Sequence, residues 1–256
     1  AISCSIKELM STYKLLFSYA EMFISALTGL SIVTKEKTMA NFVKTIATFK
    51  GPEADLDAIR SMVTKTTEST ATEDGLLNQI LPMPPELKEI ERDIYVGLLS
   101  ENMRLKDVLS IIRKDAKALN YSEASIREIS ANIEKAAKLQ ETFGYPAWYD
   151  WAKAWWNTKW DVSELRITDD IEGLLSITFH TAWSFPETPM IVLSRLFPGT
   201  QMIFRYADED IAYGRCGSMK VKGGLVTDRH IGVDKDACAK VWGYRDYRDY
   251  ESQMEA

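Results

Sequence analysis

Cysteine and histidine are both scarce in this 256-residue sequence, which has three cysteines and two histidines. The cysteines Cys4, Cys216 and Cys238 are odd in number, lie far apart and lack the CxxC spacing of a zinc or redox site. This usage is typical of a reducing compartment, so we expect a cytoplasmic protein. Because only His180 and His230 are available, a multi-histidine metal site is excluded, and a serine or cysteine nucleophile has few candidate bases.

The sequence also lacks the short motifs that impose a reaction mechanism. It contains no phosphate-binding GxxxxGK[ST], no dinucleotide-binding GxGxxG, no zinc-binding HExxH and no GxSxG nucleophile elbow. We therefore expect a protein that is not an enzyme and that uses no cofactor or metal. Three consecutive acids, Asp208, Glu209 and Asp210, could in principle hold a hard cation, but adjacent side chains cannot all face one ion, so we interpret them as a solvated turn. An enzyme that uses carboxylates such as Asp208 or Glu209 remains a third hypothesis, which a deep pocket gathering these acids with His180 would support.

Positive charge is in deficit overall, since 31 basic residues face 37 acidic ones and give a net charge of −6. A broad, salt-driven attraction to nucleic acid phosphates is therefore not expected, although a local basic patch stays open. The 46% of hydrophobic residues are enough to build a sizeable globular core.

Residues 1–38 differ from the rest of the chain. Residues 15–33 form a mostly apolar run that is long enough to span a membrane, but Glu21 interrupts it at a cost of about 3 kcal/mol. We favour the interpretation that Met39 begins the native protein and that residues 1–38 are an added leader. The alternative is an amphipathic or membrane-associated helix, and membrane contact is expected only in that case.

The hydrophobic pattern after Met39 predicts an α+β protein with a ferredoxin-like β-α-β-β-α-β sheet, an inserted helical block and an extra C-terminal strand. The expected strands are 42–49, 164–168, 174–183, 202–206 and 214–221, and the expected sheet-packing helices are 53–63 and 188–197. The resulting divisions are a leader (1–38), the first strand and helix with a Pro-rich connection (39–85), the helical insertion (86–142), the Trp-rich helix with the rest of the ferredoxin-like domain (143–226), and a C-terminal tail (227–256).

Five of the seven tryptophans fall between residues 148 and 160. Trp148, Trp151, Trp155 and Trp156 are spaced so that they share one face of a helix, and we expect this face to anchor the helix onto the sheet. A stacking platform for nucleic acid bases is the alternative. In the tail, residues 244–250 repeat Tyr, Arg and Asp with period three. Two interpretations of this segment stay open: it binds a partner, or it is an exposed terminal helix.

Several segments together resemble a known family. They are GYPAWYDW at 144–151, NTKWD at 157–161, TAWS at 181–184, LFP at 196–198 and RYADE at 205–209. In this order they are similar to the YubB-type, Api-like ferredoxin-like domain of phage and conjugative-plasmid proteins, from about residue 39 to 225. His180 stands where an acidic residue is expected in that family, and Asn157 stands where glycine is common.

The resemblance implies a ferredoxin-like fold, a mobile-element setting and a bacterial host cell, but no activity. It marks a set of family-motif residues that we expect to be structural: Trp148, Tyr149, Asp150, Trp151, Lys159, Trp160 and Trp183. We expect a non-enzymatic accessory protein that binds an unknown host or phage protein. The alternative is nucleic acid binding through a polar and basic sheet face, and the candidate binding surface is Lys44, Arg166, Thr178, His180 and Arg205.

Overall fold

The computed structural model describes residues 41–254, so the expectation for residues 1–38 lies outside the described part of the chain. The strands are β1 (Phe42–Lys50), β2 (Ser163–Ile171), β3 (Leu174–Ala182), β4 (Gln201–Asp208), β5 (Arg215–Lys222) and β6 (Leu225–Val233). The helices are α2 (Glu53–Glu68), α3 (Leu76–Ile80), α4 (Ile94–Ser100), α5 (Leu105–Leu119), α6 (Glu123–Phe143), α7 (Trp148–Trp155), α8 (Glu187–Leu196), α9 (Lys235–Trp242) and α10 (Tyr247–Met254).

The six strands form one antiparallel sheet in the order β2-β3-β1-β4-β5-β6. The first four strands of this order, with α2 and α8 as connections, make the β-α-β-β-α-β arrangement of a ferredoxin-like domain. The α+β class and the ferredoxin-like sheet expected from the sequence are therefore confirmed. β5 and β6 continue the sheet beyond β4 as a hairpin turned by Gly223 and Gly224, both at positive φ.

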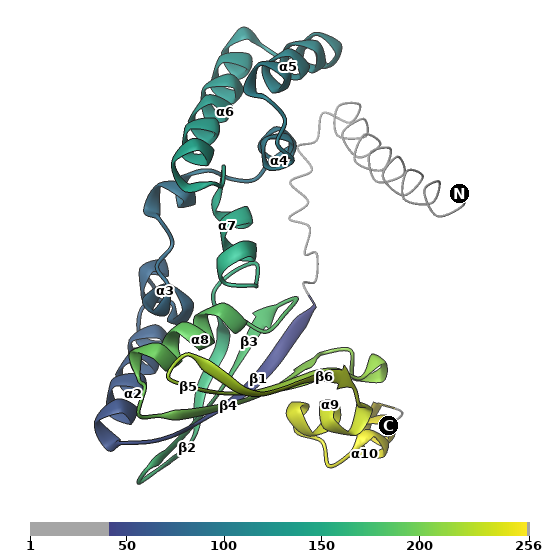
Figure 1. Ribbon diagram of the computed structural model, residues 1–256. Coiled ribbons are helices and arrows are strands. Elements are labelled where there is room, and N and C mark those ends of the chain that lie inside the picture. Colours follow the sequence, from purple (N-terminus) through teal and green to yellow (C-terminus); the bar gives the residue numbers. More distant parts are fainter. Residues whose placement is uncertain (1–40, 255–256) are drawn as a thin grey trace.

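Helices cover both faces of the sheet (Figure 1). On the face that we call the α2/α8 face, Ala47, Phe49, Phe179 and Phe204 are fully buried in the main core. The opposite face, which we call the α9 face, holds a smaller cluster in which Ala207 and Cys216 of the sheet pack against Cys238 of α9. Along β1, buried residues alternate with half-buried ones, because successive side chains of a strand point to opposite faces of the sheet.

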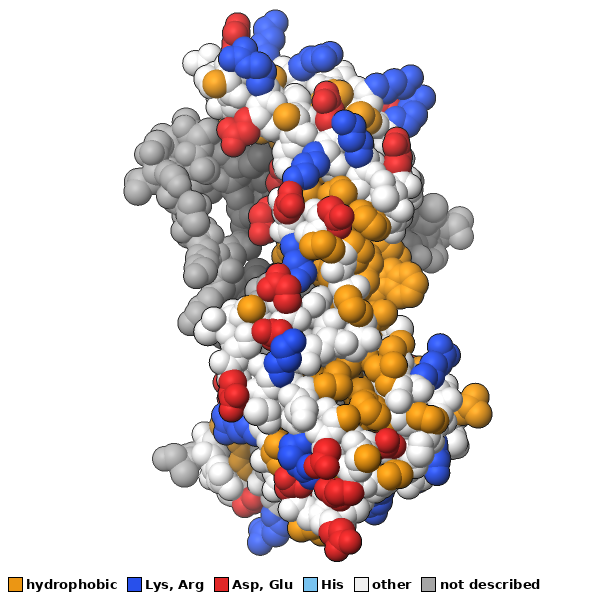
Figure 2. All heavy atoms as spheres, turned by 90° about the vertical axis from the view of Figure 1, so that its left-hand side faces the viewer, with side chains coloured by type: hydrophobic (Ala, Val, Ile, Leu, Met, Phe, Trp, Pro, Cys, Tyr) orange, Lys and Arg blue, Asp and Glu red, His pale blue; other side chains and the backbone are white. Residues whose placement is uncertain are grey.

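The helical insertion rises from the sheet as a stalk, with α4, α5 and α6 at its far end (Figure 1). Its helix ends follow the sequence signals, because Asn120 and Gly144 take the left-handed conformation after α5 and α6, and Ser122 Oγ accepts the Ser125 N–H at the start of α6. Figure 2 shows charged side chains over this far end and apolar side chains around the middle of the molecule.

The tryptophan stripe is divided between the core and the surface. Trp151 and Trp156 are buried, and the Trp156 Nε1–H donates to the Leu81 carbonyl at 2.8 Å, which ties α7 to the Pro-rich connection. Trp155 is 44% exposed, although its ring stacks on Trp151. α7 has only eight residues and ends at Trp155, so this last tryptophan of the stripe lies beyond the part of the helix that packs against the core.

The segment expected to be a tail after residue 226 is instead ordered as most of β6 followed by α9 and α10. β6 is exposed on both faces over nearly its whole length, so it lacks the alternating apolar pattern that identifies a half-buried strand. Asp234 caps α9, where its carboxylate accepts the Ala237 N–H at 2.9 Å. The tyrosines of α10 pack against α9, and none of the residues of α10 is buried.

Candidate functional site

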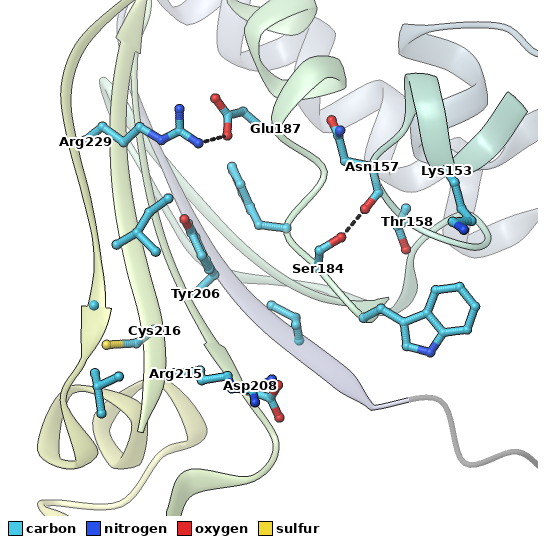
Figure 3. Close-up of a pocket in the computed structure, with 16 residues that line it drawn as sticks. Lys153, Asn157, Thr158, Ser184, Glu187, Tyr206, Asp208, Arg215, Cys216 and Arg229 are labelled. Atoms are coloured by element: carbon cyan, nitrogen blue, oxygen red, sulfur yellow. Dashed lines mark hydrogen bonds and ion pairs between the residues drawn. The ribbon is translucent and has the colours of Figure 1, made fainter. Parts of the chain in front are cut away.

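A groove of about 860 Å³ opens on the α2/α8 face, beyond the N-terminal end of α8 (Figure 3). One wall is formed by the end of α7 and the loops around residues 157 and 184, and the other is formed by β5 and β6. β1 and β4 provide the floor between these walls. The groove is therefore bounded on one side by the two strands that extend the ferredoxin-like sheet.

The floor of the groove is aromatic. The rings of Phe185 and Tyr206 stack in parallel, with 4.4 Å between their centroids and 4° between their planes. This position depends on Gly217, which pairs with Tyr206 across β4 and β5, because an added Cβ there would meet the Tyr206 hydroxyl oxygen at 2.4 Å. Burial raises the pKa of the Tyr206 phenol above its usual value, so the ring stays neutral at physiological pH.

The helical wall brings together two of the sequence motifs. The Ser184 hydroxyl donates to the Asn157 carbonyl, and the Asn157 side-chain oxygen accepts the Thr188 N–H at 3.0 Å. The buried Thr158 hydroxyl donates to the Ala182 carbonyl at 2.8 Å. Segments 157–161 and 181–184, far apart in the sequence, thus hold each other in place beside the groove.

Three cations gather around the Tyr149 ring at the outer end of this wall. Arg92 lies 4.8 Å, Lys153 5.1 Å and Lys159 5.9 Å from its centroid. Lys159 also lies over the ring of Trp183, which is 41% exposed and lines the groove. The motif residues therefore place positive charge against aromatic faces, an attraction of about 0.5–1 kcal/mol for each exposed pair.

The strand wall contributes aliphatic side chains and two arginines. Ile231 and Val233 of β6 line the groove and are 62% and 76% exposed. Arg229 donates to the Glu187 carboxylate at 2.6 Å and so joins β6 to the start of α8 across one end of the groove (Figure 3). Arg215 of β5 is exposed and lines the groove near Asp208.

Asp208 is the buried carboxylate of the groove. It accepts hydrogen bonds from the Asn41 side-chain amide at 2.6 Å and from the Asp210 N–H at 2.9 Å. His180 lies on the α9 face, where its ring is 5.1 Å from that of Trp242. The sheet therefore separates His180 from Asp208, so no shared pocket of these two groups adds support to the third hypothesis.

The candidate binding surface from the sequence is brought together on the α9 face. In one row across the sheet, Arg166 pairs with Thr178, which is followed by Ile46 and then Arg205. His180 and Lys44 pair with each other two residues further along β3 and β1. These five side chains thus share a face, opposite the groove.

Two pKa shifts mark this surface. Burial, with a further contribution from Arg166, lowers the pKa of Lys44, whose ammonium lies 5.6 Å from the Trp242 ring centroid. Burial and the charge of Lys44 lower the pKa of His180. Arg166 forms an ion pair with Glu164. Part of the positive charge of the α9 face is therefore covered by α9 or neutralised.

Sequence reasoning missed Lys153, Arg215, Arg229, Ile231 and Val233. Most of β6 was expected to be tail, so its four groove residues, Arg229, Ile231, Gly232 and Val233, had no predicted place on the sheet. Phe185, which directly follows the TAWS motif, was not singled out either. Its stacking partner Tyr206 lies in the RYADE motif, so the two motifs together pointed to this part of the chain. Within residues 41–254 no group of three His, Cys, Asp or Glu side chains is arranged to hold a metal ion, and no helix there is long and apolar enough to cross a bilayer.

The fold and the groove together define an α+β protein with a ferredoxin-like sheet extended by a hairpin. Residues 155–254 match the family model described as the ferredoxin-like domain in Api92-like proteins. Among solved structures, the chain is similar to a crystal structure of protein api92 from Yersinia pseudotuberculosis, with 12% sequence identity, a TM-score of 0.40, and coverage of 75% of this chain and 98% of that chain. No curated protein matches the chain.

Proposed function

We propose that this chain is a non-enzymatic accessory protein that acts by binding another protein, and that the groove on the α2/α8 face is the contact site. The single observation that carries the proposal is the apolar rim of the groove. Trp183, Ile231 and Val233 are 41%, 62% and 76% exposed around an aromatic floor, and apolar surface of this kind usually marks a contact with another molecule. The accompanying setting, a phage or plasmid protein in the cytoplasm of its bacterial host, rests on the family resemblance of the sequence motifs.

Site-specific photo-crosslinking in the cells that encode the protein tests this function. We expect p-benzoylphenylalanine in place of Val233 to crosslink to one protein, which then binds the purified chain with a measurable Kd. The same amino acid in place of Tyr121, which is exposed in the turn between α5 and α6, is the matched control and should give no such product. If replacement of Val233 and of Trp183 both repeatedly give no crosslinked protein, the proposal is contradicted.

Nucleic acid binding through the α9 face is the second candidate function. It is favoured by one observation, the alignment of Lys44, Arg166 and Arg205 on a shared face. If these residues contact phosphates, the logarithm of the affinity for a labelled oligonucleotide falls linearly with the logarithm of salt concentration, and Arg205→Ala reduces the slope by about 1. Binding that does not change with salt excludes this candidate.

A further inference from the structure

Positive charge without an ion-pair partner among the described residues lies on both walls of the groove. Lys153, from α7, and Arg215, from β5, line the groove and are exposed. Neither forms an ion pair within residues 41–254, whereas Arg229 is paired with Glu187. An occupant would therefore meet two cations that face it from opposite sides.

The acidic side chains of the groove do not balance these cations. Glu187 is engaged by Arg229 at 2.6 Å. Asp208 is 7% exposed and accepts hydrogen bonds from Asn41 and the Asp210 amide, so two carboxylates in the lining face three cations, Lys153, Arg215 and Arg229. The groove thus carries excess positive charge in a chain whose net charge is −6. Complementary charge on a partner would raise both its rate of association and its specificity.

Apart from these cations, the groove is apolar in its middle part and along β6, which lies outside Arg215 of β5. The stacked pair of Phe185 and Tyr206 forms the floor, and the exposed side chains of Ile231 and Val233 form the edge of the strand wall. Aliphatic side chains of an occupant would fill this middle part, because burial of apolar area gains about 25 cal/mol per Å². Nucleic acid would also supply negative charge, and Trp183 offers an aromatic face to a base, but the exposed aliphatic side chains of Ile231 and Val233 favour the aliphatic residues of a protein segment.

We propose that the groove binds a segment of a partner protein in which acidic residues flank aliphatic ones. The carboxylates of this segment pair with Lys153 on the helical wall and Arg215 on the strand wall, while its aliphatic side chains pack on Phe185, Tyr206 and Ile231. This inference rests on the proposed protein-binding function and specifies the chemistry of the partner.

A synthetic peptide provides the probe. Fluorescein-labelled Glu-Leu-Glu-Val-Glu-Leu-Glu is titrated with the full chain and followed by fluorescence anisotropy. Three comparison probes separate the contributions: the same peptide with lysine for glutamate, the same peptide with serine for leucine and valine, and a 15-nucleotide single strand of DNA. We expect saturable binding of the first probe and at least about tenfold weaker binding of the other three.

Charge reversal supplies the matched test in the protein. Lys153→Glu combined with Arg215→Glu should weaken binding of the glutamate peptide by at least about tenfold and allow the lysine peptide to bind. The control is Arg113→Glu with Lys114→Glu, which makes the same change of charge at two exposed residues of α5 and should leave both affinities as in the wild type. Circular dichroism shows whether each variant keeps its fold and melting temperature.

Two results would overturn the inference: a glutamate peptide that binds no more tightly than the lysine peptide, the serine peptide or the DNA, or a charge-reversed protein that fails to exchange its preference while folded. Crosslinking at Val233 reports separately on protein binding. A crosslinked partner that lacks acidic and aliphatic residues at its contact would leave the proposed function intact and remove only this account of partner chemistry.

Discussion

The carboxylate of Asp161 lies so close to Gly75 that a Cβ added to this glycine would come within 2.4 Å of Asp161 Oδ2. The two Asp161 oxygens accept the backbone N–H groups of Leu77 and Asn78 at 2.9 Å each. Asp161 is thus the cap of α3 from a position 84 residues later in the chain than Leu77. This contact fastens α3, which precedes the helical insertion, to the segment that leads into β2, and it gives the last residue of the NTKWD motif a structural role.

Replacement of Asp161 by alanine should destabilise the protein by about 1–3 kcal/mol, because the N–H groups of Leu77 and Asn78 lose their acceptor inside the protein. Urea unfolding followed by tryptophan fluorescence measures the loss. The control is Asp170→Ala, which removes an exposed ion pair with Arg60 and should cost less than about 1 kcal/mol. Equal losses for the two variants would show that the cap contributes no more than a surface pair.

Much of the ferredoxin-like sheet could be predicted from the sequence, and the groove could not. Apolar and β-branched residues run together in β1, and apolar residues alternate with polar ones in β3, so both segments were identified as strands from the sequence. β6 buries neither face, so its sequence lacks the apolar alternation of a strand and was interpreted as part of a C-terminal tail. The groove draws its residues from α7, from the segment between β3 and α8, and from β4 to β6, and only the order of the strands brings these parts together.

The candidate binding surface on the α9 face was also predictable only in part. Lys44, Thr178 and His180 share a face, since residues paired across neighbouring strands, and residues two apart on one strand, point the same way. The presence of α9 over part of that face was not foreseeable, because a helix of eight residues at the end of a chain carries no signal for where it docks. Trp242, which contacts both Lys44 and His180, was the missing neighbour.

Gly217 controls the floor of the groove. Gly217→Ala should destabilise the protein by about 1–3 kcal/mol, because the new methyl group displaces the Tyr206 ring from its stack on Phe185. Tyr206→Leu removes the ring that is displaced, so the double variant should be more stable than the sum of the two single losses allows. A double-mutant cycle from urea unfolding measures this coupling, and additive losses within about 0.5 kcal/mol would contradict the contact.

Thr45 carries a buried hydroxyl without a hydrogen-bond partner among the described residues. Thr45→Val should therefore raise the free energy of unfolding by about 1 kcal/mol, since it removes the cost of burying this group while keeping its shape. Thr181→Val is the matched control, because the buried Thr181 hydroxyl donates to the Ser184 carbonyl at 2.8 Å. Its loss should destabilise the protein by about 1 kcal/mol. A lower melting temperature for Thr45→Val would show that its hydroxyl is satisfied in solution.

His180 should make the protein less stable as the pH falls below 6.5. Burial and the charge of Lys44 lower the pKa of His180 in the folded protein below the usual histidine value of 6.5; Glu164 raises this pKa and Arg166 lowers it. The unfolded chain therefore binds a proton at a higher pH than the folded chain, and the free energy of unfolding decreases as the pH drops from 6.5 through the folded-state pKa.

Lys44→Met removes the nearest like charge, so the His180 pKa should move back toward 6.5 and the loss of stability on acidification should shrink. Urea unfolding between pH 7.5 and 5 measures the stability, and an NMR titration of the His180 imidazole measures the pKa directly. A midpoint at or above 6.5 in the wild type would contradict the burial of this ring against Trp242 and Phe42.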